Sequence, residues 1–487
     1  MMYEAKVNEL AEEFGVHRNT IRNWINSGTL PAQKGPGRRY LIQLEAYRKL
    51  CEKYGRTPRI DGIRPSSPPP PAARPPQEQT TLQVVRLTEK TNSLYPESTM
   101  VETCTTCGSC ASACPLSGVD GLDPRKIIRM AFLGLNEELL AIDWPWKCTL
   151  CGRCEESCSM DVRIVDLIRT LRAARERTKV PHPLQKGITL CLEKGNNLGI
   201  PKTDFTKLLN TLGEELHQGA CRGFVTPIDV RGARLLITVN SRDPFAEPER
   251  LTWWWRIFHA AQESWTIASE NWEGVNWAYY TGDDNAMKTM VARIVDNMKR
   301  LNCQALLLPE CGHAYYATRL GLQRWFPEAL KTYTVYSVFD LLMEYICGKR
   351  IILDNSVHNQ LTAIHDPCHY GRQSRKAFGQ SFYRESRAIT QACCPNMTEL
   401  EPTMDDTYCC GAGGGANAGP FTVERVYYGR KKARQIKESK AQLIVTSCHN
   451  CKDQMEQTLN REFDLGIEVK LLWELVAQAL HQRPDQS

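Results

Sequence analysis

The stretch from Cys104 to Pro115 reads CTTCGSCASACP, and its four cysteines follow the spacing C-x2-C-x2-C-x3-C-P. A second stretch, Cys148 to Ser159, reads CTLCGRCEESCS and repeats this spacing, with serine in place of the proline. Thiolates are soft ligands, and short regular intervals let several of them surround one metal centre. The two stretches therefore predict two metal sites of one kind.

The spacing resembles that of bacterial two-cluster ferredoxins, in which the fourth cysteine of each run ligates the cluster of the other run. The resemblance implies two [4Fe–4S] cubane clusters. The first would bind Cys104, Cys107, Cys110 and Cys158. The second would bind Cys148, Cys151, Cys154 and Cys114. Two four-cysteine zinc sites and unliganded thiols are the alternatives, and the repetition of one spacing disfavours both.

The segments around these runs predict helices. The 33 residues between the runs have helical periodicity, and VRIVDLIRTLRAARER (162–177) predicts a basic amphipathic helix. We therefore expect an all-α two-cluster ferredoxin domain over residues 96–180, similar to that of succinate dehydrogenase iron–sulfur subunits.

Length and composition limit the class of protein. A chain of 487 residues, 42% hydrophobic and 24% charged, has room for roughly three globular domains. No apolar run approaches the ~18 residues of a membrane helix, and the N-terminus lacks a secretory signal. A cytoplasmic protein is expected, peripheral at most on the inner face of a membrane. In that reducing compartment, the 21 cysteines indicate metal binding rather than disulfides.

The chain divides into segments of different composition. Residues 1–60 hold eleven Lys/Arg and six Asp/Glu, a net charge of 11 − 6 = +5 out of +6. Residues 61–95 include RPSSPPPPAARPP and predict a semi-rigid Pro-rich linker. Beyond residue 180, strand-like apolar runs alternate with helical patterns, which predicts an α/β domain.

That last segment contains an internal repeat. QALLLPECGHA (304–314) resembles AQLIVTSCHNC (441–451), and AYYTGDDN (278–285) aligns with TYCCGAGG (407–414). Tyr280 and Thr281 thus stand where the second copy has Cys409 and Cys410. Two tandem units are predicted, a degenerate one over 181–350 and an intact one over 351–487.

The intact copy carries a five-cysteine pattern in HDPCHYGR, YCCGAGGG and TSCHNC. This pattern resembles the cysteine-rich CCG domain of heterodisulfide reductase catalytic subunits. The resemblance implies a noncubane [4Fe–4S] cluster on Cys368, Cys409, Cys410, Cys448 and Cys451. Catalytic roles are expected for Cys409, Cys410 and His369. His365, His369 and His449 all flank the cysteines and are candidate proton donors, with a structural role as the favoured alternative for each.

The glycines after Cys410 are expected to let the backbone approach the cluster. A dinucleotide loop is the alternative, but GAGGG lacks a G-x-G-x-x-G register. Of the remaining cysteines, Cys311 occupies the repeat position of Cys448, which leaves a role near the cluster open. The other seven are expected to be small buried hydrophobes. They are Cys51, Cys191, Cys221, Cys303, Cys347, Cys393 and Cys394.

The order of these sites along the chain is similar to that of the cytoplasmic iron–sulfur subunit of membrane redox complexes in sulfate reducers. It also resembles the iron–sulfur subunits of glycolate oxidase and anaerobic glycerol-3-phosphate dehydrogenase. The resemblance implies an oxidoreductase subunit that passes electrons between a membrane cytochrome b or quinone-reactive partner and a disulfide or thiol substrate. A redox-responsive DNA-binding regulator is the alternative.

Six tryptophans lie in the degenerate unit, at 253, 254, 255, 265, 272 and 277. Three in succession cannot all share one helix face, so at least one is expected to face outward and favour a partner surface.

Residues 1–60 resemble a MerR/excisionase-type helix-turn-helix domain with a basic wing, and Gly15 supports the predicted turn. DNA contacts are expected from the second helix and the wing, with protein docking as the alternative. The candidate residues are Arg18, Asn19, Thr20, Arg22, Arg38 and Arg39, with Lys34 nearby.

Overall fold

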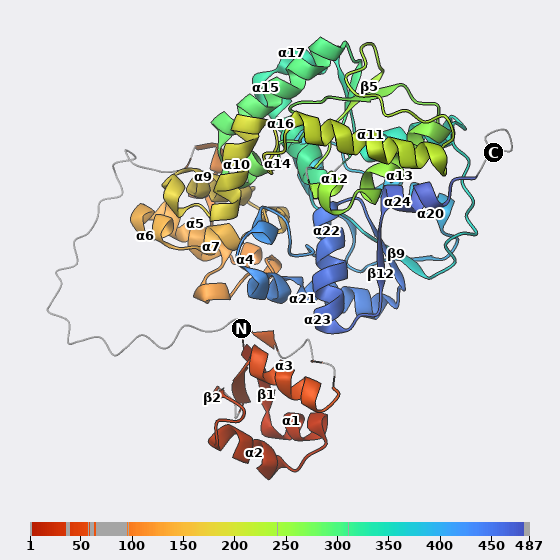
Figure 1. Cartoon of the computed structure of the whole chain (residues 1–487). Coiled ribbons are helices and arrows are strands. Elements are labelled where there is room, and N and C mark those ends of the chain that lie inside the picture. The colour runs from red at the N-terminus through yellow and green to blue at the C-terminus, as the bar shows by residue number, and fades with distance from the viewer. Residues whose placement is uncertain are drawn as a thin grey trace.

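The computed structural model describes residues 2–35, 39–56, 58, 63–64, 95, 97–240, 242–309 and 311–481. The predicted Pro-rich linker lies outside these residues except for 63–64 and 95. Figure 1 shows a separate N-terminal module and a larger body that contains the cysteine-rich segments.

The N-terminal module packs three helices on a small antiparallel sheet with the strand order β2-β3-β1-β4. Helix α1 ends at Gly15, whose φ of 63° is the left-handed turn that the sequence predicts. The sequence did not indicate the first strand. The elements are β1 (Met2–Lys6), α1 (Val7–Phe14), α2 (Arg18–Asn26), β2 (Ala32–Lys34), β3 (Arg39–Gln43), α3 (Leu44–Lys53) and β4 (Ile63–Arg64).

The segment with the two ferredoxin-type cysteine runs contains helices and 3-10 turns and, within its described residues 97–218, no strand. Its elements are η2 (Glu97–Thr99), η3 (Val101–Thr103), α4 (Ser109–Ala113), η4 (Val119–Gly121), α5 (Pro124–Phe132), α6 (Asn136–Ala141), α7 (Trp144–Lys147), α8 (Arg153–Glu156), α9 (Ile164–Ala173), η5 (Arg177–Lys179), α10 (His182–Lys194) and α11 (Lys202–Gln218).

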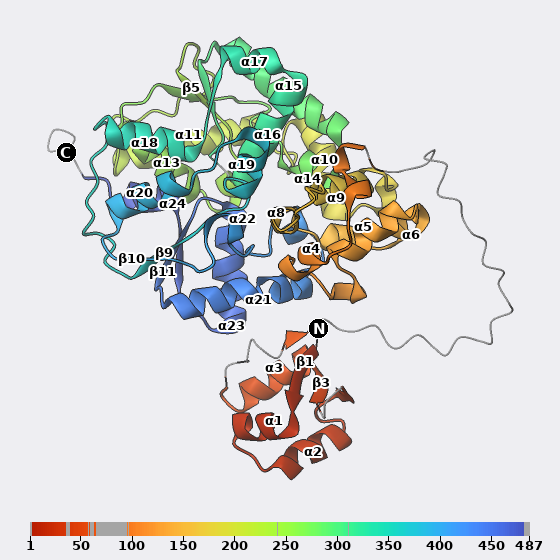
Figure 2. The same ribbon diagram turned by 180° about the vertical axis from the view of Figure 1, so that it is seen from behind.

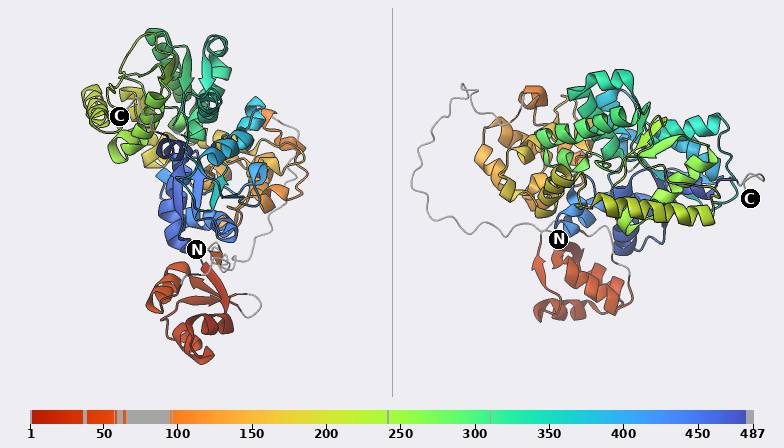
Figure 3. Two further views of the ribbon diagram at one scale, coloured as in Figure 1. Left: turned by 90° about the vertical axis from the view of Figure 1, so that its right-hand side faces the viewer. Right: turned by 45° about the horizontal axis from the view of Figure 1, so that its top comes forward.

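Two parallel four-stranded sheets follow, with the orders β6-β5-β7-β8 and β10-β9-β11-β12. In each sheet the first strand pairs with the second on one side and with the third on the other. The identical order agrees with the repeat in the sequence. Figure 3 shows the first half (green) and the second half (blue) one above the other in its left panel, with the helical segment (orange) beside them.

The first half contains β5 (Leu235–Ile237), α12 (Arg242–Ala246), α13 (Glu249–Ala260), β6 (Trp265–Ile267), α14 (Asn276–Thr281), α15 (Asp284–Leu301), β7 (Ala305–Leu307), α16 (Gly312–Trp325), α17 (Pro327–Thr332), β8 (Thr334–Tyr336) and α18 (Val338–Cys347).

The second half contains β9 (Thr362–His365), α19 (Arg372–Phe378), α20 (Tyr383–Cys393), β10 (Met397–Thr398), η6 (Met404–Asp406), η7 (Ala416–Ala418), α21 (Thr422–Ser439), β11 (Leu443–Thr446), α22 (His449–Asp453), the π-helical turn η8 (Gln454–Leu459), α23 (Asn460–Phe463), β12 (Glu468–Leu471) and α24 (Leu472–Gln478).

Four of the six clustered tryptophans are buried, and Trp253 and Trp277 are partly exposed.

Six of the seven cysteines that were expected to be small buried hydrophobes are buried. Cys347 is exposed, because it is the last residue of α18, so the prediction for this residue is wrong. Among the described residues, no helix combines the length and apolar content needed to cross a bilayer.

Candidate iron–sulfur site

Two of the predicted CCG cysteines follow the carboxyl ends of parallel strands. Cys368 comes after β9 and Cys448 after β11, and these adjacent strands lie where the strand order of the second sheet reverses. Side chains that leave a parallel sheet at such a switch point converge in one crevice. Figure 2 shows α8, α14, α16, α19 and α22 meeting near this end of the sheet.

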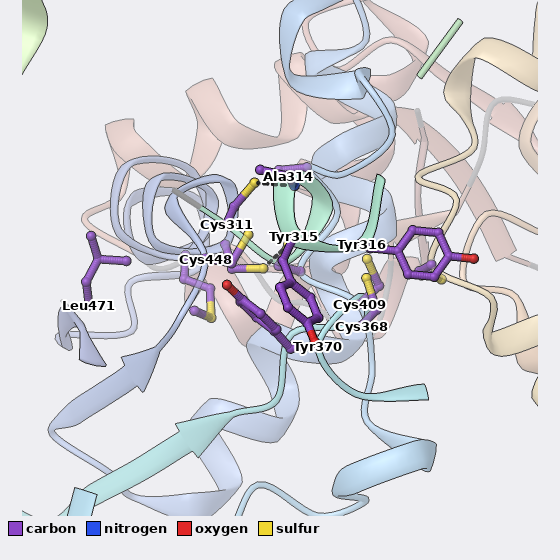
Figure 4. Packing of buried hydrophobic residues seen from close by; sticks show 14 of the residues in the cluster. Cys311, Ala314, Tyr315, Tyr316, Cys368, Tyr370, Cys409, Cys448 and Leu471 are labelled. Atoms are coloured by element: carbon purple, nitrogen blue, oxygen red, sulfur yellow. Dashed lines mark hydrogen bonds between the residues drawn. The ribbon is translucent and has the colours of Figure 1, made fainter. Parts of the chain in front are cut away.

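The five sulfur-bearing side chains are buried together. The Cys410 and Cys451 sulfurs lie 3.2 Å apart. The Cys409 thiol hydrogen-bonds with those of Cys368 and Cys410. Cys448 hydrogen-bonds with Cys451, which joins the five into one chain of sulfurs. Figure 4 shows three of them, Cys368, Cys409 and Cys448, within one packed region.

The pKa directions show how these thiols share their protons. Hydrogen bonds from neighbouring thiols, with that of Cys409 the largest cause, lower the pKa of Cys410 well below its ordinary value. The hydrogen bond with Cys409 and burial raise the pKa of Cys368. A bound metal would instead favour the thiolate form at every position.

Buried cations around the sulfurs fit an anionic cluster. Arg372 is 2% exposed, and its guanidinium donates to the backbone carbonyls of Asp405, Cys151 and Thr407. Arg172 is fully buried and also donates to carbonyls, while desolvation lowers its pKa to about 10. No carboxylate within the described residues pairs with either arginine. Because an unpaired buried charge is costly, these cations fit sites that hold negatively charged iron–sulfur thiolates.

The second ferredoxin-type cysteine run contacts the CCG cysteines directly. The Cys151 sulfur lies 3.1 Å from the Tyr428 hydroxyl, and that hydroxyl lies 2.7 Å from the Thr149 hydroxyl. Thr149 in turn lies 3.4 Å from the Cys409 sulfur. Arg172 reinforces the junction by donating to the carbonyls of Cys148 (2.5 Å) and Gly414 (2.8 Å).

The glycine run has a role that the sequence did not indicate. A β-carbon at Gly414, whose φ is +59°, would lie 2.6 Å from the carbonyl carbon of Thr149. One at Gly413 would lie 2.9 Å from the Thr149 oxygen. The absent side chains therefore let the second ferredoxin-type loop dock against the CCG loop.

Seven of the eight ferredoxin-type cysteines fall into two groups in space. Cys110 interacts electrostatically with Cys104 and Cys158, whereas Cys114 interacts with Cys148 and Cys151. This grouping is the exchange of fourth cysteines that the ferredoxin resemblance implies. Cys154 belongs to the second group, and Cys107 is exposed beside Ser109.

Two histidines near the CCG cysteines have lowered pKa values. His369 is fully buried, and desolvation together with His313 lowers its pKa well below the ordinary value. Its Nδ1 lies 3.3 Å from the Cys368 sulfur. Burial, with Lys432 nearby, lowers the pKa of His365 in the same way. The Nδ1 atom of His449 lies 3.1 Å from the Asp243 carboxylate.

A cavity of about 660 Å3 adjoins this region. Its lining includes Ala412 and Gly415 from the loop after Cys410, and Asn450 of α22. Asn276 and the partly exposed Trp277 of the first half also line it. The volume and mostly apolar lining suit a small organic ligand.

Sequence reasoning missed several residues of this region. Thr149, Arg172, His313, Arg372 and Tyr428 were not singled out. Only His313 carried a signal, because it follows Cys311 in the repeat position that holds Asn450 in the second copy.

In the N-terminal module, Arg18, Asn19 and Arg22 are exposed on α2, while Thr20 is half-buried. Arg18, Arg22, Lys34 and Arg39 line one concave surface. Arg38 lies outside the described residues.

Three family models match the chain: a helix-turn-helix domain over residues 6–46, a 4Fe-4S dicluster domain over 100–162 and a CCG cysteine-rich domain over 362–456. The chain therefore combines regions similar to three different domains. The predicted resemblance to heterodisulfide reductase-like proteins is confirmed by these domains and by the relatives that follow.

A probable membrane-anchored ferredoxin of Chromohalobacter salexigens is 21% identical over 431 residues, which cover 79% of this chain and 60% of that protein. An Hdr-like menaquinol oxidoreductase iron-sulfur subunit 2 of Archaeoglobus fulgidus is 23% identical over 389 residues, 65% of this chain and 67% of that one. Subunit C2 of a CoB-CoM heterodisulfide, ferredoxin reductase of Methanococcus maripaludis is 33% identical over 119 residues, 24% of this chain and 63% of that one. The chain thus spans about two thirds of the length of each relative.

Among solved structures, glutamate racemase RacE1 of Bacillus anthracis matches with a TM-score of 0.25 and 14% identity, over 51% of this chain and 79% of that one.

Proposed function

We propose that the chain is an electron-transfer oxidoreductase subunit with two [4Fe–4S] cubanes and one noncubane [4Fe–4S] cluster. Residues 96–180 form the helical two-cluster domain, and 181–350 and 351–487 form a degenerate and an intact CCG unit. The cubanes take the two groups of four cysteines described above, and the noncubane cluster takes Cys368, Cys409, Cys410, Cys448 and Cys451.

The observation that carries this proposal is the junction between Cys151 and Cys409. Tyr428 and Thr149 link these two sulfurs through contacts of 3.1, 2.7 and 3.4 Å. A ligand of the second cubane therefore lies beside a ligand of the CCG cluster. Such proximity suits the transfer of single electrons from one centre to the next.

The cavity at the CCG loops is the proposed site for a disulfide or thiol substrate. Reduction of a disulfide breaks one S–S bond and consumes two electrons and two protons to give two thiols. The bound clusters supply the one-electron chemistry, and a membrane quinol or cytochrome b partner supplies the electrons. Cys409 and Cys410 hold the reacting centre, and His369 is positioned to hold a proton at Nε2.

The names of two relatives, a membrane-anchored ferredoxin and a menaquinol oxidoreductase subunit, support a membrane redox partner. They are consistent with a peripheral position on the inner face of the membrane.

Electron paramagnetic resonance of anaerobically purified protein, oxidised with candidate thiols, tests the proposal. A thiol-dependent signal in addition to those of the cubanes is expected, and Cys409→Ser should abolish it. An iron count that accounts for two clusters alone would refute the third cluster.

The concave basic surface of the N-terminal module favours a second candidate, DNA binding in a redox-responsive regulator. Phosphate contacts by Arg18, Arg22 and Arg39 would make duplex binding fall steeply between roughly 50 and 200 mM salt. Binding of the full chain to duplexes selected from a random pool measures this. Arg22→Ala should weaken binding, and Lys49→Ala on α3, whose side chain is 74% exposed, is the control.

A further inference from the structure

The degenerate first half inserts one turn into the cysteine site of the second half. Cys311 caps the N-terminus of α16 after strand β7, as Cys448 caps α22 after strand β11. Both strands lie next to the switch point of their sheets. The repeat thus places Cys311 and Cys448 at equivalent positions of the two halves.

The donor atoms of this turn meet the CCG cysteines. The Cys311 sulfur, a ring nitrogen of His313 and the Cys448 sulfur all lie within 4.8 Å of one another, and all three residues are buried. Figure 4 shows Cys311 and Cys448 side by side. Cys311 also hydrogen-bonds with the Cys448 thiol, so the two sulfurs are in direct contact.

The packing around the turn holds it in this position. A β-carbon at Gly312 would lie 3.1 Å from the backbone nitrogen of Tyr370 and 3.2 Å from the β-carbon of His369. The His313 ring packs on that of His369, with 3.8 Å between the centroids. The Gly414 amide lies 3.4 Å from His313 Nε2. With the contact between Cys311 and Cys448, first-half atoms therefore contact all three cysteine-bearing segments of the second half.

We propose that Cys311 is a sixth thiolate ligand of the CCG cluster, so that both halves of the repeat build one centre. Soft sulfur is the donor that iron–sulfur clusters select, and this sulfur already touches a predicted ligand. His313, which is 3% exposed and has no hydrogen-bond partner at Nδ1 among the described residues, positions the turn against His369. This inference rests on the proposed third cluster.

Mössbauer and electron paramagnetic resonance spectra of ⁵⁷Fe-loaded Cys311→Ala and Cys311→Ser proteins provide the test. Both variants should keep the cubane signals and change the third-cluster signals, and the alanine variant should lose iron from that cluster. Ser is close to Cys in size, which keeps a readout if Ala disturbs folding. Cys303→Ala is the matched control, because Cys303 is buried in the same half two residues before β7, and this variant should leave every signal unchanged.

The proposal would be overturned if the third-cluster spectra of both Cys311 variants superimposed on those of the wild type. Cys311 would then only hydrogen-bond with Cys448 and would not be a ligand. That result would leave the proposed function intact. A wild-type protein without any third cluster would overturn both, so the two failures are distinguishable.

Discussion

The Thr149 hydroxyl lies 3.4 Å from the Cys409 sulfur, although 260 residues separate them along the chain. Thr149 belongs to the second ferredoxin-type run and Cys409 to the CCG pair. Tyr428 completes the junction by contacting both Thr149 and Cys151 through one hydroxyl. This hydroxyl is one of the polar groups that link the two proposed cluster sites, beside a direct hydrogen bond between the Cys151 and Cys409 thiols.

Tyr428→Phe should therefore lower the reduction potential of the second cubane. Hydrogen bonds to cluster sulfurs favour the reduced, more negative state, and Phe removes the donor while preserving the ring. A hydrogen bond worth about 1 kcal/mol corresponds to roughly 40 mV for one electron. A redox titration followed by electron paramagnetic resonance measures the change.

Tyr427→Phe is the matched control for that experiment. Its hydroxyl donates to the Ser117 carbonyl at 3.3 Å. We expect a potential equal to that of the wild type. Equal shifts in both variants would mean that the Tyr428 hydroxyl does not act on the cluster sulfur.

Gly414→Ala should destabilise the junction itself. Its β-carbon would approach the backbone of Thr149 to 2.6 Å and the Cys148 oxygen to 2.9 Å, and neither is a flexible side chain. Left-handed strain costs about 1–2 kcal/mol, and overpacking adds about 1–3 kcal/mol. Thermal unfolding and iron content should both decrease.

Gly466→Ala isolates the strain from the contact. Gly466 has a φ of +62°, close to the +59° of Gly414, and a β-carbon there would meet nothing within 4 Å. The control should lose the strain energy alone and keep its iron. Identical unfolding midpoints for the two variants would show that the docking contact contributes nothing.

The cysteine sites could be predicted because their information is local. Each ferredoxin-type run and the pair Cys409–Cys410 are recognisable from spacing within a short stretch, and the repeat reveals the equivalence of Cys311 and Cys448. The cysteine spacing and the strand periodicity also indicated the helical segment and the parallel sheets, since both patterns depend on neighbouring residues.

The contacts between segments could not be predicted in this way. The helix over 162–177 is predicted as basic and amphipathic, yet Arg169, Arg172 and Arg175 are all buried. Arg172 donates to Gly414, 242 residues away, and nothing in the periodicity of its helix distinguishes it from a solvated arginine. Cys347 shows the opposite failure, because its place at the end of α18 exposes a residue type that is usually buried.

Arg172→Lys should show whether this residue acts by charge or by geometry. The guanidinium donates to the carbonyls of Pro145, Cys148, Tyr280 and Gly414, and an ammonium with three donors cannot reproduce that planar fork. One buried carbonyl left unsatisfied costs about 1–3 kcal/mol, so the unfolding midpoint should fall although the charge is kept. Arg163→Lys, at the N-cap of α9, is the control, since its side chain is 35% exposed. A normal midpoint for Arg172→Lys would mean that the positive charge alone is needed.

Glu263→Gln should destabilise the first half in a pH-dependent manner. This carboxylate is 1% exposed and accepts from Arg234 at 2.7 Å and Tyr345 at 2.7 Å, with Arg350 at 3.0 Å. Burial raises the pKa of Glu263, but the hydrogen bonds and the two arginines outweigh it and lower the pKa below its ordinary 4.5. A pKa that is lower in the folded state stabilises the fold at pH values above the unfolded-state pKa. This contribution is lost as the pH falls through the folded-state pKa.

The variant should therefore lose about 3 kcal/mol at neutral pH, the lower end of the cost of breaking a buried ion pair. The loss should be constant from about pH 6 to 8 and shrink as the pH falls below about 4.5, because the carboxyl of the unfolded wild-type chain binds protons there while the folded one is still ionised. Denaturant unfolding measures this. Glu328→Gln, whose ion pair with Lys331 is exposed, should change little at any pH. A difference that grows on acidification would contradict the assigned direction of the pKa.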